Sequence, residues 1–493
     1  MRTSTDYLKS LSDGRTVIVD GQPVDDVASH PAFAPIARTV GELFDLAADP
    51  ANGMQVTDEV TGAAVNRMFV APRSAEDLAA WRAAAQVWAD HTNGWVGRSP
   101  DHVGAFVAAF SQHPEAFAHE AHAHNLAENV RAFHRRLLAD DLYVSYAIIP
   151  PQVSRATTAH AWDGDFIQVG VKEEREDGIV VRGAQMLATG GAVADEILVS
   201  CIKPLTPEDA DFAISFTVPV ATAGLKLYCR RPYATGTTSD FDYPLSSRYD
   251  ETDALLVFDD VFIPWKDVFV YKDVPGLRRQ FFDTGAHVLG NFQAQVRFAT
   301  KLRFLAGIAR KVAAVNGVDK FPGVVEKLGE LASLVSVVES ALHAAQFTAA
   351  ADEQGLFRPG AQSLYAAMGL QAELHPRVIG ILRELVGGGV LQVPSSVAEL
   401  VNAETEQDME RYVSSPGVSS VDRVKLFKLA WDAIGSEFAG RHQSYELFYS
   451  GAPFVVKGYA FRNYDYDRTV AAVEEFLGSY GVSEPAGREE AAR

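Results

Sequence analysis

The spacing of apolar residues changes twice along this 493-residue chain, and the change restricts the folds it can adopt. Residues 1–150 carry apolar positions at mainly helical spacing, and residues 151–275 carry short β-branched runs between Asp, Gly and Pro. Residues 276–485 return to helical spacing, and residues 486–493 are typical of a solvated tail. We therefore expect an α+β protein with an N-terminal helical domain, a middle antiparallel sheet or β-barrel, and a C-terminal helix bundle.

Two local patterns refine this expectation. In the middle region, Asp259-Asp260 predicts a turn within a strand-like run. In the last region, residues 421–448 are apolar at helical spacing without an obvious break, so they predict one long helix.

A capped helix leads into a charged loop in the first region. Ser74, with Asp77 three residues later, predicts the helix start, and Gly94 and Gly97 predict its end. One face of this helix is apolar and carries Leu78, Trp81, Ala85 and Trp88. The following loop, Arg98-Ser99-Pro100-Asp101-His102, combines a permanent cation, a rigid proline, a carboxylate and an imidazole. A firmly held loop of this composition predicts a binding or catalytic site.

Charge and composition exclude several classes of protein. The formal net charge is −20, which argues against binding to nucleic acid or an anionic membrane, because both require clustered Lys and Arg. The two cysteines, Cys201 and Cys229, argue against a disulfide framework and favour a reducing cytoplasm. The first residues lack the apolar core of a secretory signal, and no run of 18 apolar residues predicts a membrane span.

The common cofactor and metal motifs are not found in the sequence. There is no GxGxxG between a strand and a helix and no GxxxxGK[ST], so neither a Rossmann dinucleotide site nor a phosphate loop is expected. His119, His122 and His124 are three and two residues apart rather than four, so we interpret them as packed or solvent-facing rather than as zinc ligands. Any redox chemistry would therefore take its electrons from a source outside these motifs.

Six segments occur in the order found in one enzyme family. They are YLKSLSDGRTVIVDGQPVDDVASHPAF, GRSPDHV, IIPPQVSR, GIVVRGAQMLATGGAVADEI, FDYPLSSRYDETDALLVFDDVFIPWKDVFVY and RVKLFKLAWDAIGSEFAGRHQSYE. Over nearly its whole length the chain resembles the two-component, reduced-flavin-dependent aromatic hydroxylases of the 4-hydroxyphenylacetate 3-monooxygenase type. It is especially similar to oxygenases that hydroxylate tyrosine-like or coumarate-like phenols in bacterial secondary metabolism.

This resemblance implies a fold, a reaction and partners. The fold would be of the acyl-CoA dehydrogenase kind, assembled as a homotetramer through the C-terminal helices. A separate NAD(P)H-dependent flavin reductase would supply FAD as FADH2, and O2 would be the co-substrate. Through a C4a-hydroperoxyflavin, one oxygen atom would reach the ring carbon ortho to a phenol hydroxyl.

The resemblance also assigns residues to the phenol. Arg98 matches the arginine that holds the phenol oxygen, and Ser99 and Asp101 lie in the same substrate-contacting loop. The family places Tyr where this chain has His102, and His where it has Tyr146, so the two residue types have exchanged places. We expect Arg98, His102 and Tyr146 to be catalytic, with His102 as the base. The alternative for His102 is a solvent-facing histidine at a helix start.

For FAD, the matching positions are Gln152, Arg155 and Thr189, with Arg441 and Ser444 added from the GRHQSYE segment. A glutamine can bond the flavin ring edge and an arginine suits the pyrophosphate, although Arg155 could instead form a surface ion pair. A further departure lies at Gln293, where many relatives have His. His287 is close in sequence but out of register, so it is given no catalytic role.

Several alternatives stay open at this stage. Within the family, attack at a substituted carbon could expel halide or nitrite. An acyl-CoA dehydrogenase-like flavin enzyme and a non-catalytic helical assembly protein are alternatives of other classes. The sequence leaves open which phenol is used and whether it is free or bound to a carrier protein.

Overall fold

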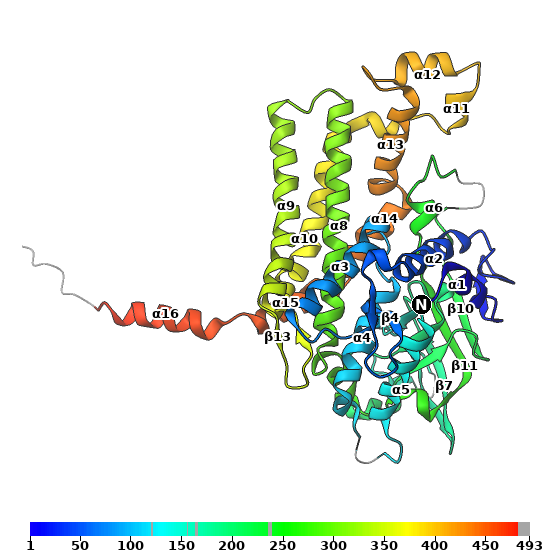
Figure 1. Cartoon of the computed structure of the whole chain (residues 1–493), viewed down its shortest axis with the longest axis vertical. Helices are drawn as coiled ribbons and strands as arrows, with labels where there is room; N and C mark the ends of the chain where they lie inside the picture. The colour runs from blue at the N-terminus through cyan, green and yellow to red at the C-terminus, as the bar shows by residue number, and fades with distance from the viewer. Residues whose placement is uncertain (120–121, 155, 163–165, 235–238, 482–493) are drawn as a thin grey trace, which may run out of the picture.

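The computed structural model describes residues 1–481 except 120–121, 155, 163–165 and 235–238 (Figure 1). The predicted tail at 486–493 therefore lies outside the described residues. Helices dominate the first part of the chain, as expected. They are α1 Ser4–Ser10, α2 Ala34–Ala48, α3 Ala75–His91, α4 Pro100–Gln112 and α5 Leu126–Asp140. Between them lie the short strands β1 Thr16–Val19, β2 Gln22–Pro23, β3 Gln55–Thr57 and β4 Ala64–Asn66.

The helix predicted after Ser74 is confirmed as α3. The Ser74 hydroxyl accepts a hydrogen bond from the Asp77 backbone N–H at 3.1 Å, which satisfies one of the free donors at the helix start. The expected apolar face is buried, and the Trp88 indole donates to the Leu43 carbonyl at 2.7 Å. After α3 the chain turns at Gly94, which has φ +71°. A β-carbon there would lie 2.5 Å from the Arg297 carbonyl oxygen, so this position is suited to glycine.

The middle of the chain forms strands in each of the predicted runs. They are β6 Gly170–Glu174, β7 Gly178–Gln185, β8 Glu196–Val199, β9 Ser215–Pro219, β10 Leu225–Cys229, β11 Ala254–Pro264 and β12 Val268–Val270, and β5 Val144–Ala147 precedes them. A short helix, α6 Ser246–Tyr249, precedes β11. The predicted turn at Asp259-Asp260 is wrong, because β11 continues through it as a bulge: the pairing register with β7 shifts between Phe258 and Val261.

The expected β-barrel is also wrong. Over the described residues the two larger sheets are both open, one in the order β2-β1-β10-β11-β7-β6 and one in the order β12-β9-β8-β5, and the pairs β3-β4 and β13-β14 stand apart from them. The outer strands of one sheet are not laddered to those of the other, so neither sheet closes. Phe216 of β9 and Phe258 of β11 meet with ring centroids 6.0 Å apart, which joins the two sheets through side chains.

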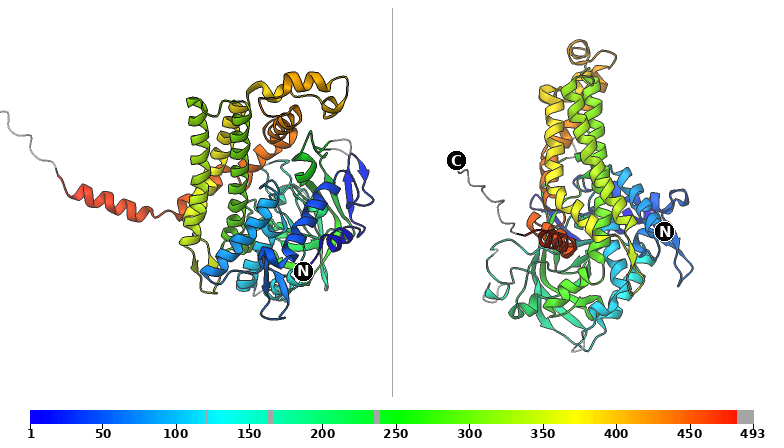
Figure 2. Two further views of the ribbon diagram at one scale, coloured as in Figure 1. Left: turned by 45° about the horizontal axis from the view of Figure 1, so that its top comes forward. Right: turned by 90° about the vertical axis from the view of Figure 1, so that its left-hand side faces the viewer.

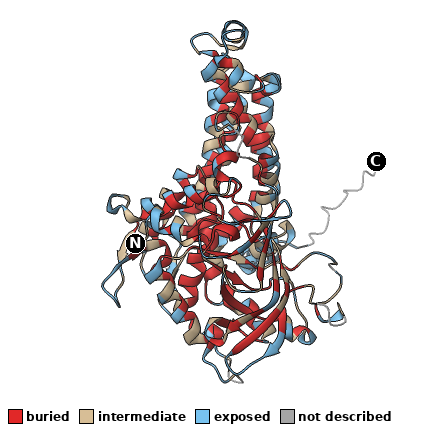
Figure 3. Ribbon diagram, turned by 90° about the vertical axis from the view of Figure 1, so that its right-hand side faces the viewer, coloured by how far each residue is buried: buried red, intermediate tan, exposed pale blue. Residues whose placement is uncertain are grey.

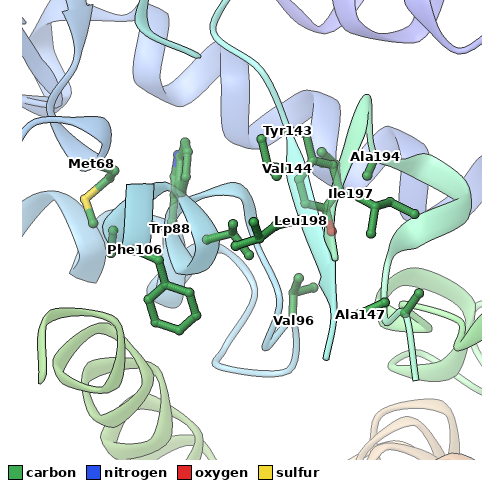
Figure 4. Packing of buried hydrophobic residues seen from close by; sticks show 14 of the residues in the cluster. Met68, Trp88, Val96, Phe106, Tyr143, Val144, Ala147, Ala194, Ile197 and Leu198 are labelled. Carbon is green, nitrogen blue, oxygen red and sulfur yellow. The ribbon is translucent and has the colours of Figure 1, made fainter. Parts of the chain in front are cut away.

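Strands from the first 150 residues complete both sheets. β1 pairs in parallel with β10, and β5 pairs in parallel with β8. Parallel neighbours require a crossover connection, and here the long segments between these strands supply it. Figure 3 shows many buried residues in the sheets and in the helices beside them. Figure 4 shows Phe106 of α4 and Val144 and Ala147 of β5 within this core.

A helix bundle follows the sheets, as predicted. It contains α7 Val274–Phe282, α8 Ala286–Val315, α9 Pro322–Phe347, α10 Ala361–Val386, α11 Ala398–Val401, α12 Glu406–Val413, α13 Ser420–Ile434 and α14 Glu437–Phe448. A hairpin of β13 Ala350–Ala351 and β14 Phe357–Arg358 joins α9 to α10. The single helix expected over 421–448 is two helices, because α13 ends before Gly435 and the Ser436 side chain caps α14.

Helices α8, α9 and α10 pack along one another and rise above the sheets (Figure 2). In the described part of the chain, α9 is the one helix long and apolar enough to cross a membrane by length and composition, and helices in the core of a bundle meet the same criterion. Helix α15 Pro453–Asn463 packs against α10, and the chain then leaves the body as α16 Tyr466–Gly478. Figure 1 shows α16 projecting away from all other elements, and none of its residues is buried.

Candidate active site

The loop of residues 97–101 is held at the centre of the molecule by distant segments of the chain. The backbone N–H groups of Gly97 and Arg98 donate to one carboxylate oxygen of buried Glu251, at 2.8 and 2.6 Å. The Tyr143 hydroxyl donates to the Arg98 carbonyl at 2.6 Å. The Tyr449 hydroxyl donates to the Gly97 carbonyl at 2.7 Å. The loop backbone is therefore fixed before any ligand binds.

Arg98 turns its side chain inward, with 7% of the residue exposed. Its Nη2 donates to the Tyr449 carbonyl at 2.9 Å, and its Nη1 faces Nε2 of His102 at 3.2 Å. The guanidinium lies 3.9 Å from the centroid of the Tyr449 ring and 5.1 Å from that of Tyr146. A guanidinium keeps its charge in such a site, and the aromatic faces stabilise it.

His102 lies in the first turn of α4 and is 2% exposed, so the alternative of a solvent-facing histidine is wrong. Nδ1 of its ring faces the side-chain oxygen of Gln293 at 3.3 Å. The ring centroid lies 4.9 Å from that of Phe106 and 5.5 Å from that of Tyr146. Burial, reinforced by the neighbouring charge of Arg98, holds the pKa of His102 well below its usual value. The imidazole is therefore neutral near pH 7.

Ser99 and Asp101 stabilise the loop by a hydrogen bond between their side chains. The Ser99 hydroxyl donates to the Asp101 carboxylate, and both residues are buried. Burial raises the pKa of Asp101 to about 6, against the opposing effect of hydrogen bonds from Ser99 and Gln293. Pro100 opens α4 at a position where the missing N–H costs nothing.

A buried charge cluster lies behind Tyr449, between α8, α10 and α14. Glu446 accepts from Arg297 at 2.5 and 2.8 Å, from Lys301 at 2.7 Å and from Gln371 at 2.8 Å. These cations outweigh burial and hold the pKa of Glu446 below its usual value. Burial lowers the pKa of Lys301 to about 8. The Arg297 guanidinium also lies 4.6 Å from the Tyr449 ring centroid, so Arg98 and Arg297 both lie close to that ring.

Two of the residues expected to bind flavin are joined in one network. The Thr189 hydroxyl donates to Asp253 at 2.6 Å, and Arg441 of α14 donates to the same carboxylate at 2.8 Å. Arg441 also donates to Glu251, the residue that holds the backbone of the Arg98 loop. The network therefore links the predicted flavin residues to the predicted phenol residues.

The other flavin candidates are placed differently. Gln152 lies exposed in the loop after β5, and Ser444 lies exposed on α14. Arg155 lies outside the described residues. Large apolar side chains remain exposed near Gln152, namely Val153, Leu187 and Ile202. Their segments lie close in space because Ile149 pairs with Met186 and the Ile202 N–H donates to the Ile148 carbonyl.

Three important neighbours of Arg98 and His102 are not predicted from the sequence. The sequence marks Gln293 only as a departure from a family pattern, although an arginine one turn later in α8 could have indicated an inward face. Tyr449 lies just beyond the segment that carries the resemblance, and Glu251 lies within such a segment without a distinguishing motif. The histidines at 119, 122 and 124 are unrelated to this site: the rings of His122 and His124 pack against Trp265 at 4.6 and 4.8 Å.

Two family profiles together match almost the entire chain. The profile described as 4-hydroxyphenylacetate 3-hydroxylase N terminal matches residues 3–270, and the one described as 4-hydroxyphenylacetate 3-hydroxylase C terminal matches residues 277–478. The chain belongs to this family. The resemblance seen in the sequence is thereby confirmed.

Individual relatives cover most of the chain. The 4-hydroxyphenylacetate 3-monooxygenase oxygenase component of Pseudomonas aeruginosa is 35% identical, covering 93% of this chain and 88% of the relative. A monooxygenase of Streptomyces globisporus is 37% identical, covering 91% and 85%. Its name gives its substrate as (3S)-3-amino-3-(3-chloro-4-hydroxyphenyl)propanoyl on the peptidyl-carrier protein SgcC2.

A solved structure of the family has the same fold. The oxygenase component (HpaB) of 4-hydroxyphenylacetate 3-monooxygenase, complexed with FAD and 4-hydroxyphenylacetate, matches with a TM-score of 0.91 and 31% identity. The match covers 97% of this chain and 99% of that structure. The predicted combination of helices and sheets in this order is confirmed at the level of the fold, without the barrel.

Proposed function

We propose that this chain is the oxygenase component of a two-component monooxygenase, which uses reduced FAD from a separate reductase and O2 to hydroxylate a phenol ortho to its hydroxyl. The observation that carries the proposal is the buried Arg98 guanidinium beside the neutral imidazole of His102, lined by aromatic rings, in a member of this family. A phenol needs a cation for its oxygen, an acceptor for its proton and a dry aromatic wall for its ring.

Different residues meet these three needs. Arg98 holds the phenol oxygen and stabilises the negative charge that develops there. His102 receives the phenol proton at Nε2, because that ring nitrogen faces the Arg98 guanidinium, which can only donate, and so must be the acceptor of a neutral imidazole. Tyr146 and Phe106 border the His102 ring and form the wall against the substrate. Ser99 and Asp101 affect the substrate indirectly, because their hydrogen bond helps to hold the loop that carries Arg98.

The residues present fit FAD. The exposed apolar group Val153, Leu187 and Ile202 gives a surface that a flat ring system would cover, with the polar Gln152 beside it. The Tyr445 hydroxyl on α14 is buried without a hydrogen-bond partner among the described residues, so a donor and acceptor is available on that side. We assign Gln152, Thr189 and Ser444 to FAD, with Arg155 from the sequence resemblance.

Arg441 is already bound to Asp253 and Glu251, and we assign it to the wall of the FAD site. When bound in its reduced form, FAD supplies the two electrons that allow one atom of O2 to enter the ring and the other to leave as water. The protein itself must keep the phenol oxygen ionised and bulk water away, and the burial of Arg98 and His102 serves both.

The proposal is tested by supplying the protein with FAD, a flavin reductase and NADH under air and scanning phenols by mass spectrometry. We expect a product with one additional oxygen atom, ortho to the hydroxyl. Peroxide as the sole product with every phenol, in the presence of bound reduced FAD, would contradict the proposal. Replacing His102 by Ala should lower the rate by roughly 10²–10⁴-fold, the usual contribution of a positioned base.

The resemblance to the Streptomyces globisporus enzyme favours one extension of this assay. That relative is named for a chlorinated phenol on a carrier protein, so β-amino and α-amino phenolic acids should be compared free and carrier-bound. Release of halide or nitrite from substituted phenols would assign the related substitution reaction instead of hydroxylation at an unsubstituted carbon.

We also propose a homotetramer in the cytoplasm. The support is the C-terminal arm, α15 and α16: α15 packs on α10, α16 projects from the body, and their apolar side chains include Phe454, Phe461 and Phe476 at 80%, 63% and 67% exposure. A single chain leaves this surface uncovered, whereas other copies of the chain would bury it. The mass of the purified protein in solution, measured by light scattering, tests the proposal.

A further inference from the structure

A closed chain of hydrogen bonds passes from Arg98 through α8 and back to the same loop. Arg98 Nη1 contacts His102 Nε2 at 3.2 Å, and His102 Nδ1 contacts Gln293 Oε1 at 3.3 Å. Gln293 Nε2 contacts the Ser99 hydroxyl at 3.5 Å, and that hydroxyl donates to Asp101. Gln293 is thus the one link in this chain that does not come from the loop or the first turn of α4.

The direction of each bond follows from its ends. A guanidinium has only donors, so Nε2 of His102 must accept and Nδ1 must carry the ring proton. Nδ1–H then requires an acceptor, and the amide oxygen of Gln293 accepts its hydrogen bond. The Gln293 amide N–H in turn donates to the Ser99 hydroxyl, whose own proton goes to the Asp101 carboxylate. Each donor in the chain faces an acceptor.

We propose that Gln293 is the positioning residue that keeps the proton of His102 on Nδ1, so that the lone pair of Nε2, which accepts from Arg98 in this structure, takes the proton of the phenol once the phenol oxygen becomes the partner of Arg98. The inference rests on the proposed function and adds to it the residue that fixes the tautomer of the base. A neutral amide suits this role because it accepts from Nδ1–H but adds no negative charge that would protonate His102 before the phenol arrives.

The other charged and titratable groups around His102 reinforce this choice. Arg98 belongs to its own loop, and Asp101 precedes it in α4. His287 and Arg297 face it from α8, Tyr146 from β5, and Tyr449 from the end of α14. Arg98 and Arg297 disfavour an imidazolium. A carboxylate at position 293 would instead favour the imidazolium. Its introduction should therefore change the pH dependence of activity and not only its size.

Two substitutions at position 293 separate positioning from a merely structural role. In Gln293→Leu, Nδ1–H loses its acceptor, and we expect kcat/KM to fall about five- to tenfold at every pH, the value of one lost hydrogen bond. In Gln293→Glu, the new carboxylate stabilises the imidazolium and raises the pKa of His102. We expect the acid limb of the pH profile to move upward by about one pH unit or more, with activity recovering at high pH.

The matched control is Asn291→Asp, which adds a carboxylate to the same helix. Asn291 donates to the His287 carbonyl and accepts from Ser450, so the new charge would face those groups instead of His102. We expect its acid limb to coincide with that of the unchanged protein. An equal loss in both Gln293 variants at every pH, without displacement of the acid limb, would overturn the inference.

A second measurement does not depend on catalysis. In protein labelled with ¹⁵N-histidine, with the His102 signal identified by its loss in His102→Asn, we expect a protonated Nδ1 and an unprotonated Nε2 near pH 7. In Gln293→Glu, protonation of Nε2 should set in at a higher pH than in the unchanged protein. A proton on Nε2 in the unchanged protein would overturn the inference. If no phenol is hydroxylated but these signals are as expected, the proposed function fails and the tautomer assignment stands.

Discussion

Arg98 combines a fixed backbone with an immobilised charge. Its N–H and carbonyl are bound by Glu251 and Tyr143, and its guanidinium by Tyr449 and His102. These contacts leave the side chain little freedom to lose when a ligand binds. The interaction that we propose with a phenol oxygen would then be pre-organised, which is the condition under which electrostatic stabilisation is strongest.

Replacement of Arg98 by Ala should therefore lower phenol hydroxylation by roughly 10²–10³-fold, the usual effect of removing one pre-organised donor. Binding of FAD should be unaffected, because the residues assigned to FAD lie on β-strand ends and α14. Turnover with a phenol and FAD titration by fluorescence check the two expectations separately. Equal losses in both would show that Arg98 supports the whole site and not the phenol in particular.

Asp101 allows a prediction of stability against pH. Its pKa in the folded protein is raised to about 6 by burial, above the value of about 3.9 for an unfolded chain. The unfolded state therefore releases its proton first, and the folded protein loses stability as the pH rises through that interval. Asp101→Asn removes this dependence, and its free energy of unfolding relative to the unchanged protein should rise by about 2 kcal/mol between pH 4 and pH 7.5.

Urea denaturation at the two pH values measures this change. Asn at position 101 retains an oxygen that accepts from the Ser99 hydroxyl, so the loop contact is preserved in the comparison. A constant difference between the two proteins across this pH range would contradict the raised pKa of Asp101.

The residues of the site differ in how far the sequence could reveal them. Arg98 and His102 are predictable because cation, proline and imidazole occur together after a capped helix. Gln293 and Tyr449 are ordinary residues of helical segments, and their importance comes from lying against His102 and Arg98 across 191 and 351 residues of sequence. Local patterns carry no information about such contacts.

At the level of elements, the bundle is joined to the site by an ion cluster with more positive than negative charge. Arg297 and Lys301 of α8 both bind Glu446 of α14, and all are almost completely buried. Removing the carboxylate would leave two buried cations without their counter-ion, a far larger cost than the loss of a surface pair.

Glu446→Gln should therefore destabilise the protein by about 3–5 kcal/mol in urea denaturation near pH 7. The control is Glu330→Gln, which breaks a solvent-exposed ion pair with Arg377 between α9 and α10 and should change stability much less. The unchanged protein should also lose stability as the pH falls through about 4.3, since the pKa of Glu446 is lowered in the folded state, and the variant should lose less there. Similar effects of the two substitutions would contradict the buried-cluster account.

Elements are predicted best where one segment determines them. The cap at Ser74 and the apolar face of α3 are correct, and so are the strand runs of the middle region. The barrel is wrong because closure depends on pairing between outer strands, and the helix over 421–448 is divided because Ser436 caps a new helix. The Asp259-Asp260 bulge likewise depends on how β11 pairs with β7 rather than on its own residues.

At the scale of the whole molecule, α16 of the C-terminal arm has no residue buried by the rest of its own chain. Removal of residues 466–493, which deletes α16 and all that follows, should lower the solution mass of the assembly while leaving the circular dichroism of the body almost unchanged. Light scattering of the full and shortened proteins checks this expectation. A full-length protein that is already monomeric would contradict it.

The anchoring of Arg98 by Tyr449 has a consequence for biosynthesis. The two residues are separated by 351 positions, so the guanidinium cannot reach its final place until almost the entire polypeptide has left the ribosome. A nascent chain has its loop and its first sheet strands long before it has a competent oxygen-handling centre. A chain that ends before Tyr449 would therefore contain the loop of residues 97–101 but could not hold the Arg98 guanidinium in its final position.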